Sequence, residues 1–285
     1  MLKLLKSGFY TSVQDKGRFG YRDKGVPVSG AMDGLALSMA NALLENEEDA
    51  AVLEITMTGP TIEFEENTFI VLTGAKMSAT LNNQPISNYK VHEVGIGDIL
   101  SYGKLENGFR SYLAVKDGFT TPKVLGSRSF SKALTRVTYL KDRSILPYTP
   151  CSIFKPKIEE IKIDSYFEEK VLEVAKGPEY NMLGDKQLEK LFGYDFSIAK
   201  ENNRMAYQLN ETIHGHEVSM LTSATLPGTV QLTPAGKLIL LMKDGQTTGG
   251  YPRILQLTDK AISILAQKNS GILFLSNCFK ICKPL

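Results

Sequence analysis

FIVLTG (residues 69–74) and SATLNNQPI (78–86) decide the fold class of this 285-residue chain. Both stretches are short and rich in apolar or β-branched residues, which is typical of neighbouring strands. The second has Asn82-Asn83 near its centre, and asparagine tolerates the left-handed backbone of a tight hairpin turn. We therefore predict strands here, with a hairpin that turns at the two asparagines.

The same pattern of short strands continues on both sides of this region. Strand-like runs recur every eight to twelve residues with Gly, Asn or Pro between them, which favours a barrel or sandwich over a parallel α/β sheet. We predict a mainly β chain, a β-barrel with short helices. The further runs are TIEF (61–64), DILSY (98–102), RSYLAVK (110–116), MAYQL (205–209), TVQL (229–232), LILLM (238–242), RILQL (253–257) and ILFLS (272–276).

Three segments interrupt the strands with helical spacing. In residues 32–44 the apolar residues recur at helical intervals, and Ser29 or Asp33 is expected to cap the start. The residues of this stripe are Met32, Leu35, Ala36, Met39, Ala40 and Leu43. Residues 183–192 (LGDKQLEKLF) and 258–267 (TDKAISILAQ) are predicted to form two more short helices.

A long irregular stretch divides the chain. Residues 131–170 carry few periodic runs and contain Pro147, Pro150 and Pro156. We predict an N-terminal β-barrel-like half with one helix over residues 1–130, this connection over 131–170, and a C-terminal β-barrel-like half over 171–285.

Composition excludes several classes of protein. Thirty-three basic residues face 31 acidic ones, so no excess charge favours nucleic acid or a membrane surface as partner. The chain contains no run of eighteen apolar residues. Its three cysteines lack the spacing of a disulfide framework. A cytoplasmic location is the expectation.

Most catalytic sequence motifs are absent. We find no phosphate-binding G-x-x-x-x-G-K-[ST] loop, no dinucleotide-binding G-x-G-x-x-G after a strand, no H-E-x-x-H and no G-x-S-x-G. No Met-Lys-Met biotinylation signature occurs either. We therefore predict no metal site, no covalent biotin, and no ATP loop of this type on the chain itself.

KDGQTTGGYP (243–252) is the strongest candidate site. Gln246, Thr247 and Thr248 offer one amide and two hydroxyls, and Gly249-Gly250 leave the main chain open to a ligand. Such donors suit an oxyanion. The alternative is a glycine-rich hairpin whose glycines serve only the turn.

Three long stretches give the chain a family resemblance. They are TSVQDKGRFGYRDKGVPVSGAMD (11–33), FRSYLAVKDGFTTPKVLGSRS (109–129) and LPGTVQLTPAGKLILLMKDGQTTGGYPRI (226–254). The chain resembles the biotin-dependent carboxyltransferase family, also called the allophanate hydrolase subunit 2 family. Members include the C subunit of 5-oxoprolinase and KipA, a regulator that antagonises a kinase inhibitor.

The resemblance implies a fold and an activity. The expected fold consists of cyclophilin-like β-barrel domains. The implied activity is that of the C subunit in an ATP-dependent 5-oxoprolinase, a hetero-oligomer with A and B subunits that converts 5-oxoproline to glutamate. ATP, with Mg²⁺, is expected at a site involving a partner subunit. A KipA-type regulator and a carboxyltransferase served by a separate biotin carrier remain alternatives.

The sequence departs from the family pattern at particular positions. Asp117-Gly118 replaces the usual Gly-Gly, and Ala206-Tyr207-Gln208 replaces Gly-Tyr-Arg. Ser129-Phe130 stands where Ser-Thr is usual, RVTYLK (136–141) lacks the expected glycines, and Asn269-Ser270-Gly271 replaces Pro-Gly-Asp. The resemblance therefore implies that the substrate-contacting loops in the middle of the chain differ from those of the family.

The remaining candidate residues lie in or beside these stretches. Arg18 and Arg128 are expected to clamp an anionic group, because guanidinium binds carboxylate or phosphate with two parallel hydrogen bonds. A structural pair is the alternative for both: Arg18 with Asp15, and Arg128 with Asp33 or Asp244. Asp33 is expected either beside an anion site at the helix start or as the cap of that helix. The predicted substrate-binding set is Gln14, Asp15, Arg18, Tyr21, Asp33, Arg128, Arg204, Gln231, Gly249 and Gly250.

For Gln246, the family resemblance specifies the ligand. A lactam or a urea presents both a hydrogen-bond donor and an acceptor, and the glutamine side chain matches both. We therefore expect Gln246, Thr247 and Thr248 to be catalytic, with Gln231 on a neighbouring strand completing the wall of a cleft.

Overall fold

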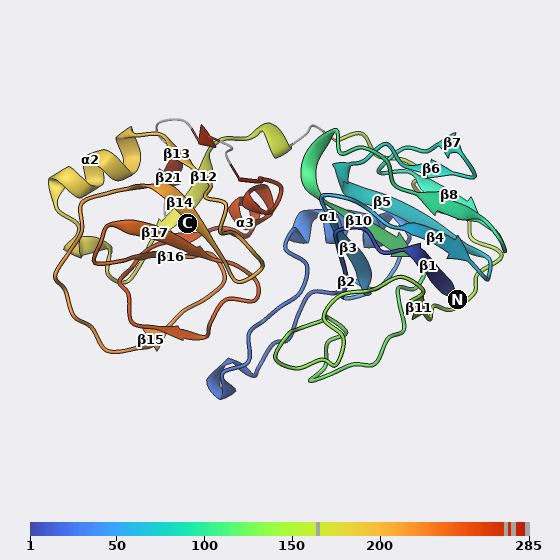
Figure 1. Cartoon of the computed structure of the whole chain (residues 1–285), viewed down its shortest axis with the longest axis horizontal. Helices are drawn as coiled ribbons and strands as arrows, with labels where there is room; N and C mark the ends of the chain where they lie inside the picture. Colours follow the sequence, from blue (N-terminus) through green and yellow to red (C-terminus); the bar gives the residue numbers. More distant parts are fainter. Residues whose placement is uncertain (164–165, 271–272, 275–277, 283–285) are drawn as a thin grey trace. The chain divides into compact units, whose positions relative to one another are not determined.

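The computed structural model describes residues 1–163, 166–270, 273–274 and 278–282. The chain forms two compact units. The first comprises Met1–Arg18 and Ser29–Asp164, and the second comprises Phe19–Val28 and Ser165–Leu285. Figure 1 shows that each unit contains its own sheets and its own helices.

The first unit is built on two antiparallel sheets. The six-stranded sheet has the order β11-β1-β4-β9-β6-β7, and the five-stranded sheet has the order β2-β3-β10-β5-β8. The strands of the six-stranded sheet are β11 (Ile145–Leu146), β1 (Leu2–Lys6), β4 (Thr61–Phe64), β9 (Ile99–Ser101), β6 (Thr80–Leu81) and β7 (Gln84–Pro85). Those of the five-stranded sheet are β2 (Tyr10–Gln14), β3 (Val52–Thr56), β10 (Asn107–Val115), β5 (Thr68–Lys76) and β8 (Val91–Val94).

The predicted hairpin is present in this unit. Strands β6 and β7 pair with Leu81 opposite Gln84, so Asn82 and Asn83 form the two-residue turn. Both asparagines have positive φ, 50° and 64°, as the favoured hairpin turns require.

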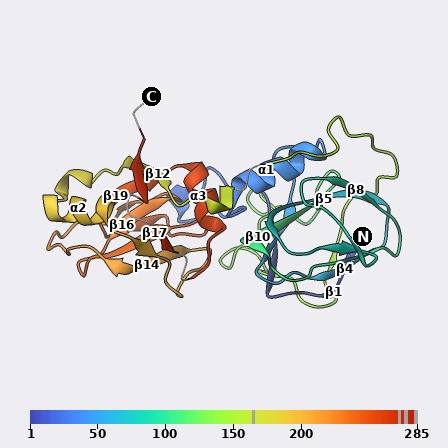
Figure 2. The ribbon, with the colours of Figure 1, turned by 90° about the horizontal axis from the view of Figure 1, so that it is seen from above.

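The predicted N-terminal helix is α1 (Gly34–Leu43). The helix lies beside β5 and β10 (Figure 2), and its buried residues Ala36, Leu37, Ala40 and Leu43 belong to one cluster with residues of the five-stranded sheet. The predicted stripe is correct for Ala36, Ala40 and Leu43, but it includes Leu35, which is only partly buried, and omits Leu37. Asp33 caps it, because its side chain accepts a hydrogen bond of 3.0 Å from the backbone N–H of Ala36. The aspartate therefore occupies the helix start that an anionic ligand would need, and the capping alternative is the one that the structure confirms.

The second unit has one main sheet, with the order β14-β17-β16-β19-β12-β21. Its strands are β14 (Ala206–Thr212), β17 (Lys237–Leu241), β16 (Thr229–Leu232), β19 (Arg253–Leu257), β12 (Leu172–Lys176) and β21 (Phe279–Ile281). Two small sheets join β13 (Phe196–Ser197) to β20 (Leu273–Phe274), and β15 (Ser223–Ala224) to β18 (Thr248–Gly249). The helices are α2 (Asp185–Gly193), α3 (Asp259–Ala266) and the 3₁₀ turns η1 (Arg22–Lys24), η2 (Tyr166–Glu168) and η3 (Tyr180–Met182).

The prediction of a mainly β chain with short helices is confirmed. Strand β20 covers two residues of the predicted run ILFLS, and the rest of that run lies outside the described residues, as does Gly271.

The boundaries of the units differ from the predicted ones. Residues 131–163 belong to the first unit, where β11 pairs with β1 and Tyr148 joins the core. Residues 19–28 belong to the second unit, although both flanking segments belong to the first. Packing against a distant core, which a local pattern does not reveal, decides both assignments.

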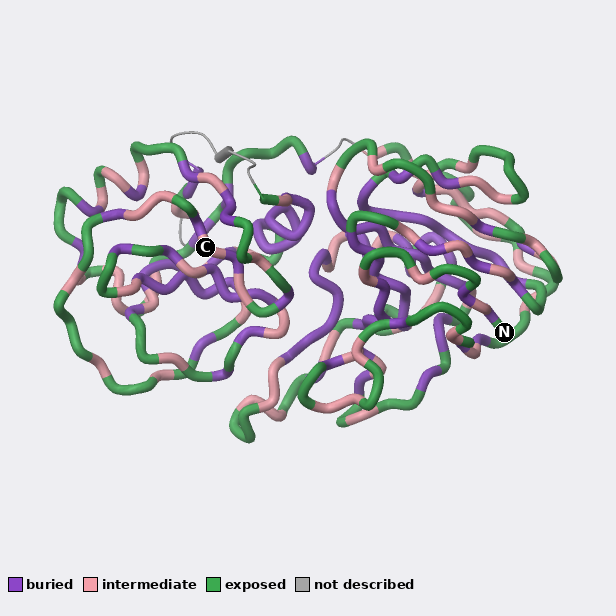
Figure 3. Tube along the Cα trace, in the orientation of Figure 1, coloured by how far each residue is buried: buried purple, intermediate pink, exposed green. Residues whose placement is uncertain are grey.

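The buried residues follow the strands in both units (Figure 3). No helix in the described part of the chain is long and apolar enough to cross a membrane.

Candidate functional site

The glycine-rich loop, defined here as residues 243–252, connects β17 to β19 in the second unit. Both strands pair with β16, which lies between them in the sheet. The loop therefore crosses over β16 and is not a hairpin between adjacent strands, so the hairpin alternative is wrong. It starts from a rigid support, because Leu238, Leu240, Leu241 and Met242 are almost completely buried.

Thr225 holds the middle of the glycine-rich loop. Its backbone N–H donates to the carbonyl of Thr247 at 3.0 Å, and its hydroxyl donates to the carbonyl of Gln246 at 2.5 Å. The short strands β15 and β18 pair immediately beside it. Thr225 is itself buried, so the loop backbone is fixed from one side.

The polar side chains of the loop point in different directions. Gln246 and Thr248 are exposed, whereas Thr247 is buried. The prediction that all three side chains face a cleft is therefore wrong for Thr247.

Gln231 contacts the glycine-rich loop from β16. It is buried on β16, its Oε1 accepts from Gln246 Nε2 at 3.3 Å, and its Nε2 donates to the Tyr251 carbonyl at 3.4 Å. A Cβ built on Gly249 would lie 2.5 Å from Gln231 Nε2, while one built on Gly250 would meet nothing within 4 Å. Gly249 therefore allows the close approach of Gln231, and Gly250 is simply exposed.

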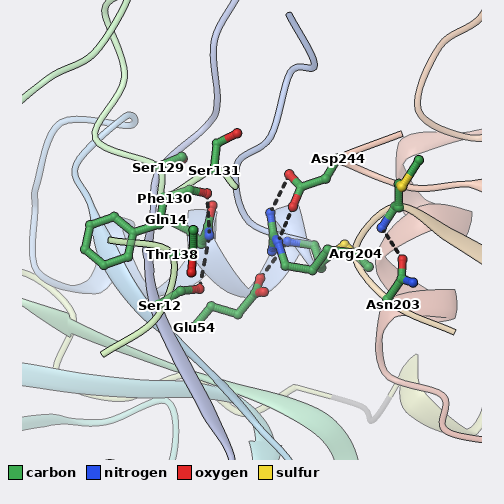
Figure 4. A network of polar contacts seen from close by, with 12 residues as sticks. Ser12, Gln14, Glu54, Ser129, Phe130, Ser131, Thr138, Asn203, Arg204 and Asp244 are labelled. Atoms are coloured by element: carbon green, nitrogen blue, oxygen red, sulfur yellow. Dashed lines mark hydrogen bonds and ion pairs between the residues drawn. The ribbon is translucent and has the colours of Figure 1, made fainter. Parts of the chain in front are cut away.

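Two arginines fix the ends of the loop by pairing with carboxylates. Arg204 donates to both carboxylate oxygens of Asp244, at 2.9 Å and 3.3 Å (Figure 4), and its carbonyl accepts from the Asp244 N–H at 2.8 Å. Arg204 thus holds the start of the loop in place through Asp244, whereas the sequence predicts that it binds substrate.

Arg253, at the far end of the loop, is a residue that the sequence motifs do not indicate. Its Nε and Nη2 donate to the two oxygens of Glu179 at 2.9 Å and 2.7 Å, and its Nη1 donates to the Ala224 carbonyl at 2.6 Å. The hydrogen bonds from Arg253 lower the pKa of Glu179, and those to Glu179 raise the pKa of Arg253. The partners are 74 residues apart, so no local motif signals the pair.

The GSRS loop, residues 126–129 of the first unit, has a buried carboxylate at its centre. Asp15 accepts hydrogen bonds from the hydroxyls of Ser127 and Ser129 and from the Arg128 N–H, each at 2.6 Å. It also accepts from the Gly17 N–H at 2.8 Å. These donors occupy the Asp15 carboxylate, which therefore organises the loop.

The two arginines of this region also bind main-chain oxygens. Arg18 is buried and donates to the carbonyls of Val124 and Ser129. Arg128 donates to the carbonyl of Thr121. Gln14 donates to the Ser12 hydroxyl and the Phe130 carbonyl, at 3.0 Å and 3.4 Å (Figure 4). The contacts of Gln14 and Arg18 connect the start of the chain to residues 124–130, and that of Arg128 lies within the connected segment.

Tyr21 lies in the segment of the first motif that belongs to the second unit. It is partly exposed, and the ammonium of Lys24 lies 5.5 Å from its ring centroid. Of the predicted residues, the second unit thus contains Tyr21, Arg204, Gln231 and the glycine-rich loop, and the first contains Gln14, Asp15, Arg18, Asp33 and Arg128.

A hollow of about 460 Å³ elsewhere in the second unit does not include these residues. It is lined by Val171, Tyr180, Phe192, Phe279, Lys280 and Ile281. Its walls are mainly apolar and lack the converging donors that an amide or oxyanion requires. The glycine-rich loop, which has exposed hydrogen-bond donors, is therefore a better candidate site for an amide than this hollow. Among the described residues, no three His, Cys, Asp or Glu side chains gather as a metal site would need.

Known proteins resemble this chain along most of its length. The model of the carboxyltransferase domain, subdomain A and B, matches residues 24–274. The chain is 34% identical to the C subunit of 5-oxoprolinase from Escherichia coli over 273 residues, which cover 94% of this chain and 87% of that protein. It is 44% identical to urea amidolyase of Lachancea kluyveri over 123 residues, 43% of this chain and 7% of that protein.

Solved structures give the same result for the fold. The structure of urea amidolyase from K. lactis matches with a TM-score of 0.86 at 26% identity, over 98% of this chain and 18% of that one. That of Kluyveromyces lactis urea carboxylase matches with a TM-score of 0.85 at 26% identity, again over 98% of this chain and 27% of that one. The chain thus spans less than a third of these larger enzymes.

Proposed function

The chain belongs to the carboxyltransferase family of subdomains A and B, and on that premise we propose that it is the C subunit of an ATP-dependent 5-oxoprolinase. The observation that carries the proposal is the match to the C subunit of the Escherichia coli 5-oxoprolinase, which covers nearly all of both chains. In this proposal the chain assembles with A and B subunits in the cytoplasm, and the complex opens 5-oxoproline to glutamate.

The glycine-rich loop supplies groups suited to such a substrate. The exposed Gln246 amide can donate to a lactam carbonyl and accept from a lactam N–H. The exposed Thr248 hydroxyl offers a further donor on the same loop. Because Thr225 and Arg253 fix the surrounding backbone, these donors need little reorganisation to stabilise charge on a carbonyl oxygen.

ATP would supply the phosphoryl group that activates the lactam, since an unactivated amide opens poorly. The sequence contains no phosphate-binding loop of the Walker type. We therefore assign ATP and its Mg²⁺ to a site completed by a partner subunit. The role that we assign to this chain is to hold the amide of the substrate.

The test is reconstitution with the A and B subunits. We expect 5-oxoproline-dependent ATP hydrolysis and glutamate formation by the assembled complex, and almost none by this chain alone. Robust turnover by the chain alone, shown by mass spectrometry to be free of partners, would contradict the shared site. Stable binding to the B subunit without any turnover would favour the regulatory alternative.

The higher local identity to urea amidolyase supports a second candidate function. In it, the same loop would hold an amide such as urea while a separate carrier delivers carboxybiotin. Carboxylation of urea by this chain with a biotin carrier, and no use of 5-oxoproline by the reconstituted complex, would select this candidate.

A further inference from the structure

Arg22 stands out among the arginines of the second unit. That unit contains Arg22, Arg204 and Arg253. The last two each form a two-point ion pair with a carboxylate, Asp244 or Glu179. Within the described residues, no carboxylate pairs with Arg22, and its Nη1 is buried without a hydrogen-bond partner.

A tight turn holds Arg22 in place. It begins the 3₁₀ turn η1, in which the Lys24 N–H donates to the Tyr21 carbonyl and the Gly25 N–H to the Arg22 carbonyl, at 3.1 Å and 3.0 Å. Gly25 ends the turn with φ of 78°, a conformation that glycine adopts without strain. The position of the Arg22 backbone is therefore well determined.

Arg22 is connected to the glycine-rich loop through Thr225. Its Nη2 donates to the Thr225 carbonyl, and Thr225 binds the carbonyls of Gln246 and Thr247. One end of the guanidinium thus fixes the residue that fixes the loop, and the other end has unused donor capacity. Leaving a buried charged donor unpaired is costly, so a site of this kind favours an anion.

We propose that Arg22 binds the carboxylate of the amide substrate held by the glycine-rich loop. The inference rests on the proposed function for the identity of that substrate. 5-Oxoproline carries a lactam and a carboxylate on one small ring, so recognition needs an amide-matching group and a cation. Gln246 provides the first and Arg22 the second. Guanidinium suits this task because its planar donors match a carboxylate.

The test compares two lactams on the reconstituted complex. 5-Oxoproline and 2-pyrrolidinone share the lactam ring, but only the first has a carboxylate. We expect Arg22→Gln to weaken binding of 5-oxoproline roughly ten- to a hundredfold, as loss of a charged hydrogen bond does, and to leave 2-pyrrolidinone binding unchanged. Arg22→Lys keeps the charge but loses the planar fork, and should give an intermediate loss.

Lys24→Gln is the matched control. Lys24 lies on the same turn and carries the same charge, but it is exposed, so its replacement should leave the preference for 5-oxoproline intact. Melting temperatures of the three variants show whether a loss reflects unfolding. Arg22→Lys keeps the test decisive if Arg22→Gln does not fold. If Arg22→Lys prefers 5-oxoproline over 2-pyrrolidinone as strongly as wild type does, the inference is wrong.

Titration calorimetry separates this inference from the proposed function. If the wild-type complex binds 5-oxoproline through its carboxylate but does not turn it over, the proposed function fails and the role of Arg22 stands. If wild type shows no carboxylate-dependent binding, or Arg22→Gln discriminates as wild type does, the inference is wrong. If Arg22→Gln raises the KM for ATP but still discriminates between the two lactams as wild type does, Arg22 binds a phosphate, and the inference is also wrong.

Discussion

The GSRS loop and the glycine-rich loop contain similar residues but use them in opposite ways. Both combine glycine with hydroxyl side chains and lie beside an arginine. In the GSRS loop, two hydroxyls and one backbone N–H converge on the buried Asp15 carboxylate, which also accepts from the Gly17 N–H. In the glycine-rich loop the carboxylates bind arginines at the two ends, and Gln246 and Thr248 remain exposed.

The partners of the carboxylates explain the difference. Asp15 accepts the hydrogen bonds that the GSRS loop could otherwise offer to a ligand, whereas Asp244, which lies within the glycine-rich loop, pairs with Arg204 instead. Glu179 acts from outside, because it holds Arg253, which in turn binds the Ala224 carbonyl beside the loop. The first arrangement gives a structural loop, and the second keeps donors available on a fixed backbone.

The largest expected effect comes from removing the central carboxylate of the GSRS loop. Asp15→Ala leaves several buried donors without an acceptor, so we expect it to reduce the free energy of unfolding by about 3–5 kcal/mol. Chemical denaturation of the isolated chain measures the loss.

Asp23 provides the control for this substitution. It lies in the same sequence motif but is exposed, so Asp23→Ala should change the free energy of unfolding by less than about 0.5 kcal/mol. A similarly small change in Asp15→Ala would remove the distinction between the two loops.

The next effect is on catalysis by the glycine-rich loop. Gln246→Ala removes an exposed amide that makes one long hydrogen bond of 3.3 Å, to the side chain of Gln231. We expect turnover by the assembled complex to fall on the order of ten- to a thousandfold, with a nearly unchanged melting temperature. Gln84→Ala, at an exposed glutamine of the first unit, should leave turnover unaltered. Wild-type turnover in Gln246→Ala would make this loop as structural as the other.

A smaller effect distinguishes the two adjacent glycines. A methyl group at Gly249 would lie 2.5 Å from Gln231 Nε2, so Gly249→Ala must displace the glutamine that supports the loop. We expect a loss of about 1–3 kcal/mol in stability together with slower turnover. Gly250→Ala meets open space and should behave as wild type in both measurements. Equal effects at the two positions would show that Gln231 does not set the conformation of the loop.

The sequence predicts local features well and distant contacts poorly. The helix at Gly34–Leu43 and the turn at Asn82 follow from spacing and turn chemistry, which are local. The hydrogen bond from Ser127 to Asp15 joins residues 112 apart, and Arg22 reaches Thr225 across 203 residues. Such contacts depend on how the strands pair. For the same reason, the sequence indicates Gln246 as a candidate but not Arg22, Thr225 or Arg253.

The smallest effect concerns the carboxylate outside the glycine-rich loop, and it depends on pH. Glu179 and Arg253 are partly exposed, at 25% and 18%, so solvent screening limits the pair to about 1 kcal/mol. Hydrogen bonds from Arg253 lower the pKa of Glu179 below its ordinary value of 4.5. A lowered pKa in the folded state means that the pair stabilises the fold above about pH 4.5 and loses that effect as the pH falls through the folded-state pKa. The difference in unfolding free energy between wild type and Glu179→Gln should therefore be full at pH 7 and shrink toward pH 3, and 1 M salt should reduce it at pH 7.

Glu63→Gln is the control for this substitution, because it removes a longer and more exposed pair with Lys3. Its unfolding free energy should differ less from that of wild type at every pH. If the difference between wild type and Glu179→Gln stays constant from pH 7 to pH 3, the ionised carboxylate does not support the loop.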